Sequence, residues 1–225
     1  MRRRWIALAA LVFAAAGLAP AQVQTKKSQA AMTPAQALER LKEGNGRFLA
    51  GKPRARDLHA SVLATASGQY PFAAVVSCMD SRAPIELVLD QGIGDMFSLR
   101  SAGNVIDADV LGGLEYAAKV TGAKLIVVLG HTHCGAVKGA IDDVRLGNLT
   151  QLLARIRPAV RMAGPGSSSK DKAFVARIEE ANVRLGMKEI RERSAVLDDL
   201  LNTGTIGLVG GMYDIETGNV VFFAD

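Results

Sequence analysis

Two short stretches of the chain gather side chains that could do chemistry. The first is AAVVSCMDSR, residues 73–82, where an apolar run ends in Cys78, Asp80 and Arg82. Their alternate spacing lets all three point the same way while the chain stays extended. The second is KLIVVLGHTHCGA, residues 124–136, where another apolar run ends in His131 and Cys134. Together these stretches hold both cysteines of the 225-residue sequence.

Two thiolates and one imidazole are a typical set of zinc ligands. Zn²⁺ binds cysteine sulfur and histidine nitrogen, and catalytic zinc sites use three protein ligands and keep a fourth position open for water. Cys78, His131 and Cys134 therefore predict a catalytic zinc site. The alternative is one structural disulfide, which is common in exported proteins. The acid, arginine and histidine beside the cysteines favour zinc, because a disulfide needs no such neighbours.

Charge counting gives Asp80 and Arg82 their expected roles. Zinc bound by two thiolates and a neutral imidazole has no net charge, so it acidifies a bound water less than a zinc that keeps its full charge. A third anionic ligand would weaken this effect further. Arg82 can hold the Asp80 carboxylate away from the metal in a bidentate pair. Asp80 would then orient the attacking hydroxide through a hydrogen bond, or it could close the site as a fourth ligand. The alternative interpretation is a surface salt bridge beside a structural zinc.

The two motifs, C-x-D-x-R followed by G-H-x-x-C, resemble those of the β-class carbonic anhydrases. The similarity runs from ALERLKEGNGRFLAGK to the C-terminal GMYDIETGNVVFF. This resemblance implies a Zn²⁺ enzyme that interconverts carbon dioxide and bicarbonate as a homodimer or homotetramer. A hydrolase of carbon disulfide or carbonyl sulfide on the same site is the alternative enzyme. A non-catalytic zinc- or anion-binding protein is the alternative of another class, and Asp80, Arg82 and Gln69 argue against it.

The resemblance also assigns a substrate pocket. Gln69, nine residues before the first cysteine, matches a glutamine that the family places against substrate from the facing subunit. Phe97, Ala102 and Tyr116 match apolar wall positions of the same narrow pocket, which suits a small apolar molecule such as carbon dioxide. Without the resemblance, each would be interpreted as core packing. His133 lies beside the ligands and is interpreted as a bystander or a proton-relay candidate.

The N-terminus has the pattern of a secretory signal peptide. Three arginines at positions 2–4 precede an apolar run over residues 5–18 and then Ala19-Pro20-Ala21. The run is short for a membrane span, so an uncleaved anchor is the less favoured alternative. We expect residues 1–21 to be removed and the protein to be exported, to the periplasm, without membrane contact after cleavage. Residues 22–32 predict a flexible leader, and residues 33–225 predict one catalytic domain.

The overall charge points to no nucleic-acid partner. The sequence has 27 Lys and Arg against 22 Asp and Glu, a formal net charge of +5. Three of those positive charges belong to the predicted signal peptide. With seven Phe, three Tyr and one Trp in the whole chain, stacking platforms for bases are scarce. Composition therefore gives no support for nucleic-acid binding.

The alternation of apolar runs and helical patterns predicts an α/β fold. Residues 73–77 and 124–129 are continuously apolar, as in strands buried on both faces of a parallel sheet. Further strands are expected at 96–100, 206–211 and 220–223, and helices at 34–50, 59–67, 85–90, 108–120, within 130–144, and at 148–162, 173–193 and 194–202. The helix within 130–144 is expected to carry Cys134 in its first turn. This order predicts a mostly parallel sheet of four strands plus an antiparallel edge strand, flanked by helices, with an N-terminal helical arm. Both ligand stretches follow strands, so they should meet at the carboxyl edge of the sheet.

Overall fold

A computed structural model describes residues 23–166 and 168–223. The predicted signal peptide, residues 1–21, lies outside the described residues. Among the helices described, none has both the length and the apolar character needed to cross a bilayer.

A single five-stranded sheet forms the centre of the molecule. Its strands are β1 (Ala73–Ser77), β2 (Met96–Arg100), β3 (Leu125–His131), β4 (Gly207–Tyr213) and β5 (Val220–Phe223). The spatial order is β2-β1-β3-β4-β5, with every pair parallel except the antiparallel hairpin of β4 and β5. The predicted α/β fold, with four parallel strands and one antiparallel edge, is confirmed. β1 and β3 are neighbours, with Ala73 opposite Leu125.

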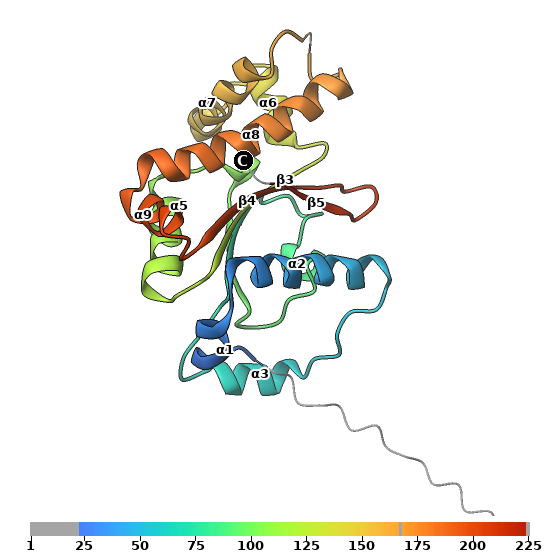
Figure 1. The fold of residues 1–225 in the computed structure, drawn as a ribbon. Helices are drawn as coiled ribbons and strands as arrows, with labels where there is room; N and C mark the ends of the chain where they lie inside the picture. Colours follow the sequence, from blue (N-terminus) through green and yellow to red (C-terminus); the bar gives the residue numbers. More distant parts are fainter. Residues whose placement is uncertain (1–22, 167, 224–225) are drawn as a thin grey trace, which may run out of the picture.

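Helices cover both faces of the sheet, as Figure 1 shows. The pleat sends alternate side chains of β1 and β3 to opposite sides. On one side, Ala74 and Val128 pack against α5 (Ala108–Glu115), η2 (Tyr116–Val120), α8 (Lys172–Arg193) and α9 (Ala195–Asn202). On the other, Val75 and Val127 pack against α2 (Pro34–Leu49) and α4 (Ile85–Val88). This double cover explains why both strands are largely apolar and are buried at every position.

A third group of helices lies beyond the carboxyl edge of the sheet. α6 (Gly135–Ile141) and α7 (Gly147–Met162) pack with the first half of α8, at the top of Figure 1. Their apolar side chains form a cluster that also contains Cys78 and Cys134. The short helix η1 (Ala102–Asn104) joins the same region from the end of β2. The two cysteines therefore lie between the sheet and this helical group, away from bulk water.

The segment predicted to be a flexible leader is helical instead. α1 (Lys26–Ala31) begins with a capping box between Thr25 and Ser28. Gln29 is buried and donates from Nε2 to the carbonyl oxygens of Pro71 and Thr121. The prediction for residues 22–32 was wrong on this point, because the bonds that hold the helix reach 42 and 92 residues along the chain. α3 (Leu58–Thr65) lies near α1 at the same end of the molecule.

Asn45 on α2 connects the first half of the chain to its last strand. Its Nδ2 donates to the carbonyl oxygens of Val88 and Gly218, and its Oδ1 accepts from the N–H of Val220. The side chain is buried, and all of these bonds are 2.9–3.1 Å long. α2 is thus fixed against the β4–β5 hairpin.

Candidate active site

The three predicted zinc ligands meet in one buried group. Cys78 follows β1 directly, His131 is the last residue of the neighbouring β3, and Cys134 lies three residues further on. Their two sulfur atoms and one ring nitrogen all lie within 4.8 Å of one another. Each residue is at most 5% exposed. The adjacency of β1 and β3 is what brings together residues that lie more than fifty positions apart.

The His131 ring is oriented for metal binding. Its Nδ1 lies 2.9 Å from the carbonyl oxygen of Thr132. A carbonyl oxygen can only accept, so Nδ1 carries the proton and Nε2 carries the free lone pair. Nε2 is buried and has no hydrogen-bond partner among the described residues. A buried acceptor without a partner is costly, and a metal ion at the cysteine sulfurs would satisfy it.

The pKa values of the two thiols are shifted in opposite directions. A hydrogen bond from Cys134 lowers the pKa of Cys78 to about 4, helped by His131 and by the N–H of Gly103. The same contact with Cys78, together with burial, raises the pKa of Cys134. The two shifts are opposite because a hydrogen bond between the sulfur atoms needs a proton on one of them. A cation between them would remove the conflict, because both cysteines could then be ionised.

Asp80 and Arg82 form the predicted bidentate pair. Arg82 donates from Nε to Oδ1 at 2.9 Å and from its terminal nitrogen to Oδ2 at 2.7 Å. These hydrogen bonds hold the pKa of Asp80 well below its usual range. Oδ2 also lies 3.8 Å from Nε2 of His131, so the carboxylate borders the ligand group. The arginine holds the aspartate beside the metal position, as expected for a site whose fourth position stays open.

Other residues hold the loop that carries Cys78 and Asp80. Arg100, at the end of β2, donates to the carbonyl oxygens of both. Tyr213, at the end of β4, donates from its hydroxyl to the carbonyl oxygen of Arg82. Gly103 donates its N–H to the sulfur of Cys78 at 3.3 Å. No motif in the sequence marks these three, although each lies at or after the carboxyl end of a strand.

Gly103 occupies a position that only glycine suits. Its φ is +67°, in the left-handed region. A Cβ at this position would also lie 2.5 Å from Cδ1 of Ile156. Any side chain would therefore push the backbone away from the Cys78 sulfur.

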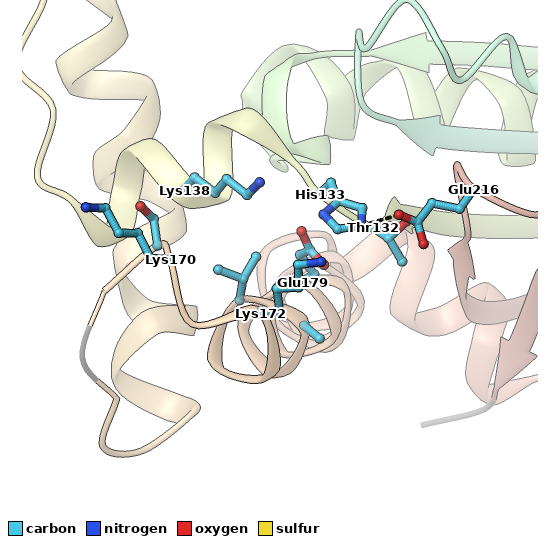
Figure 2. Close-up of a pocket in the computed structure, with 10 residues that line it drawn as sticks. Thr132, His133, Lys138, Lys170, Lys172, Glu179 and Glu216 are labelled. Atoms are coloured by element: carbon cyan, nitrogen blue, oxygen red, sulfur yellow. Dashed lines mark ion pairs between the residues drawn. The ribbon is translucent and has the colours of Figure 1, made fainter.

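The second loop, from His131 to Cys134, forms one wall of a separate pocket of about 540 Å³. Figure 2 shows His133 pointing into this pocket, where its Nε2 lies 3.3 Å from Glu216. Its φ of +60° turns the side chain out of the ligand group. Glu179 lines the same pocket and accepts the N–H of Cys134 at 2.7 Å. Cys134, predicted in the first turn of the next helix, is instead the residue that precedes α6.

The four predicted pocket residues separate into two groups. Ala102 precedes Gly103 and lies near Cys78. Phe97 lies near the start of β2 and makes an edge-to-face contact with Tyr116, with ring centroids 6.0 Å apart. Gln69 is exposed and borders a shallow pocket with Ile93 and Gly94. Gln69 precedes β1 whereas Cys78 follows it, so one chain keeps the glutamine at the opposite end of that strand from the ligands.

The donor set fits zinc. Bond lengths of about 2.3 Å to sulfur and about 2.0 Å to nitrogen place the donors of a tetrahedral zinc well inside the observed limit. Cys78, His131 and Cys134 would hold the ion, leaving one position toward Asp80. A buried Cys-His-Cys group at the carboxyl edge of a parallel sheet, with an aspartate–arginine pair beside it, defines an α/β metalloenzyme.

Comparison with known sequences places this metalloenzyme in a family. The family model described as carbonic anhydrase matches residues 73–220. Carbonic anhydrase 2 of Mycobacterium tuberculosis is 37% identical over 194 residues, covering 84% of this chain and 92% of that protein. A carbonic anhydrase of Pseudomonas aeruginosa is 30% identical over 164 residues, covering 69% of this chain and 74% of that protein. The chain belongs to the β-carbonic anhydrase family, whose members are zinc enzymes.

Solved structures agree with this assignment. A β-carbonic anhydrase of Aspergillus fumigatus is similar with a TM-score of 0.66 and 28% identity, covering 85% of this chain and 91% of that one. One of two tetrameric β-carbonic anhydrases of Sordaria macrospora is similar with a TM-score of 0.64 and 27% identity. The match covers 71% of this chain and 84% of that one.

Proposed function

We propose that this protein is a zinc-dependent carbonic anhydrase that converts carbon dioxide and water into bicarbonate and a proton, and back. The observation that carries the proposal is the Asp80–Arg82 pair beside the buried ligands. A structural zinc site has no need of an oriented carboxylate at its open side. An enzyme that must direct a water molecule at a small, weakly polar substrate needs such a carboxylate.

The residues of the site divide the work of the hydration reaction. When bound, zinc supplies a Lewis acid that makes a water molecule more acidic. Asp80 keeps Oδ2 facing the ligand group, where it can accept a hydrogen bond and direct the water's lone pair toward carbon. Arg82 fixes the carboxylate through two hydrogen bonds. The new bond joins the water oxygen to the carbon of carbon dioxide, and the released proton goes to buffer.

Stopped-flow carbon dioxide hydration on the zinc-loaded protein tests the proposal. We expect turnover that is abolished by a chelator and restored by zinc. A protein that binds one zinc per chain and shows no hydration above the buffer rate would instead be a zinc-binding protein. The same preparation assayed with carbonyl sulfide would detect the alternative hydrolase.

We further propose that the substrate pocket is completed by a second copy of the chain. Gln69, Phe97 and Tyr116 lie away from the ligand group of their own chain, whereas Ala102 lies next to it. Apolar side chains are also exposed on α3, including Leu63 at 65%. An exposed apolar surface of this kind is common at subunit interfaces. A homodimer or homotetramer would bring the first three residues to the partner's zinc site.

Subunit complementation tests this arrangement. A homodimer of the Gln69→Ala variant, or of the Cys78→Ser variant, would contain no complete active site. A mixed dimer would contain one site with intact zinc ligands from one chain and Gln69 from the other. Mixing the two inactive variants, unfolded and refolded together, should therefore restore part of the activity. No recovery in mixed dimers, or full activity of a wild-type monomer in sedimentation experiments, would contradict the shared pocket.

We also propose that the protein is exported to the periplasm and cleaved after Ala21. The support is the sequence pattern of residues 1–21. Mass spectrometry of protein isolated from the cell envelope should give a chain that starts at Gln22. Full-length protein confined to the cytoplasmic fraction would refute both export and cleavage.

A further inference from the structure

Helix α8 carries two buried polar side chains that belong to neither sequence motif. Glu179 is 3% exposed and Asn182 is 4% exposed, although most of their polar and charged neighbours on this helix face water. They are three residues apart and so lie on the same face of the helix. Burying a carboxylate or an amide is costly unless its polar atoms are hydrogen-bonded. Each of these two side chains makes a hydrogen bond to the backbone beside one of the two cysteine ligands.

Glu179 holds the loop that carries Cys134. Its Oε1 accepts the backbone N–H of that cysteine at 2.7 Å. Cys134 precedes α6 and follows His133, whose φ of +60° is uncommon for a residue with a side chain. The glutamate therefore stabilises a turn that the backbone alone does not favour, and this turn sets the position of the Cys134 sulfur.

Asn182 holds the loop that lies against Cys78. Its Nδ2 donates to the carbonyl oxygen of Gly103 at 2.7 Å. The N–H of the same glycine donates to the Cys78 sulfur at 3.3 Å. Gly103 has a positive φ and no room for a Cβ, so its peptide orientation depends on the groups around it. The asparagine thus holds the peptide group that directly follows the one donating to the Cys78 sulfur.

We propose that Glu179 and Asn182 are positioning residues for the metal centre, each fixing the environment of one thiolate from a single rigid helix. The inference rests on the proposed zinc site. Because α8 also packs against β3 and β4, it fixes both loops relative to the sheet. The effect comes from hydrogen bonds, so it requires an acceptor at position 179 and a donor at position 182.

Zinc affinity separates this role from general packing of the helix. The variants are Glu179→Ala, Glu179→Gln and Asn182→Ala, with Glu180→Ala as matched control. Glu180 is the next residue on α8, but its side chain is 51% exposed and pairs with Arg184 on the surface. Three quantities are measured for each: the zinc Kd by competition with a chromophoric chelator, the thiolate-to-metal absorption of the cobalt-substituted protein, and the melting temperature of the metal-free protein.

We expect Glu179→Ala and Asn182→Ala to weaken zinc binding by about 10- to 100-fold, the usual effect of removing a group that supports a metal ligand. Both should also shift the thiolate-to-cobalt bands. Glu179→Gln should bind zinc like the wild type, because its amide oxygen can accept the same N–H. Glu180→Ala should leave the zinc Kd and the bands unchanged.

Wild-type zinc affinity in a folded Glu179→Ala and in a folded Asn182→Ala would overturn the inference. So would a Glu179→Gln variant that is as weak as Glu179→Ala, since the hydrogen bond would then not be the cause. If the alanine variants do not fold, the zinc affinities of Glu179→Gln and Asn182→Asp are compared instead. The first variant keeps the required acceptor and should bind zinc like the wild type. The second loses the required donor and should bind zinc more weakly. A wild-type protein that binds no zinc would refute the proposed metal site itself, which is a separate result.

Discussion

Asp80 and Asp90 are both held by arginine, and they differ in how many parts of the chain hold them. Asp90, at the end of α4, accepts from Arg47, from Arg56 and from the N–H of Arg54, and its side chain is 3% exposed. Asp80 accepts only from Arg82, which is 53% exposed. Its Oδ2 keeps one side toward His131.

This difference indicates separate roles for two similar ion pairs. The carboxylate of Asp90 binds elements that are far apart in sequence, because α2, the segment before α3 and α4 meet there. Both of its oxygens accept hydrogen bonds from these elements. Asp80 is held by a single arginine from its own loop, so it contributes little to the fold and retains capacity for a reactant. Four predictions test this assignment, in order of expected effect.

Loss of a zinc ligand should have the largest effect on activity. In Cys78→Ser, His131→Ala and Cys134→Ser, we expect zinc content and hydration to fall together, by more than about 100-fold in rate, because each removes one of three protein ligands. Metal analysis and stopped-flow assays on the same samples measure both. Any of these variants with full zinc and full rate would remove that residue from the ligand set.

Asp80→Asn should separate activity from both zinc and stability. We expect a fall of about 100-fold in hydration rate, in the range for loss of a catalytic acid or base, with zinc content and melting temperature near wild type. The amide still fills the space but no longer pairs with Arg82 in the same way. A zinc loss equal to that of the cysteine variants would show that Asp80 is itself a ligand.

Asp90→Asn should have the opposite effect. We expect the free energy of unfolding to fall by about 3 kcal/mol, because two largely buried guanidinium groups lose their partner. Rate and zinc per folded molecule should stay unchanged. Asp143→Asn is the control, since Asp143 also pairs with two arginines but is 56% exposed. Equal destabilisation in both variants would mean that burial does not distinguish these pairs.

The Asp90 group should also make stability depend on pH. Burial alone would raise the pKa of Asp90, but hydrogen bonds from Arg56 and Arg47 outweigh it and the pKa is lowered. The stabilisation is therefore fully present above about pH 4, where the unfolded carboxyl is ionised, and is lost as pH falls through the lower folded pKa. Denaturant titrations of wild type and Asp90→Asn should converge in acid. A constant difference across that range would exclude Asp90 as the source.

The sequence predicted the strands and the ligands because their signals are local. β1, β2 and β5 have the predicted bounds, since each is a short run whose ends are marked by polar or turn residues. Cys78, His131 and Cys134 stand directly after such runs, so the pairing of parallel strands was enough to bring them together. β3 and β4 each begin one residue later and end two residues later than predicted, and several helix ends also differ by one or two residues.

The supporting residues were missed because their partners are distant in sequence. Glu179 and Glu180 are identical neighbours in a charged helix, and only packing decides which one is buried. A signal was nevertheless present, because Glu179 lies on the apolar stripe formed by Val175, Ile178 and Val183. Gln29 gave no comparable signal, which explains the error over α1. In the proposed shared pocket Gln69 belongs to the second chain, so the structure of one subunit does not place it at the site.

The contact between Asn45 and the last strand has a consequence for self-association. β5 is the outer strand of the sheet, and an unpaired outer strand offers backbone groups that can bind another sheet. The side-chain oxygen of Asn45 accepts a hydrogen bond from the N–H of Val220 at the start of this strand. One amide on α2 thus shields part of the border along which chains could stack into fibrils. This border is therefore less available for aggregation than a fully unpaired edge would be.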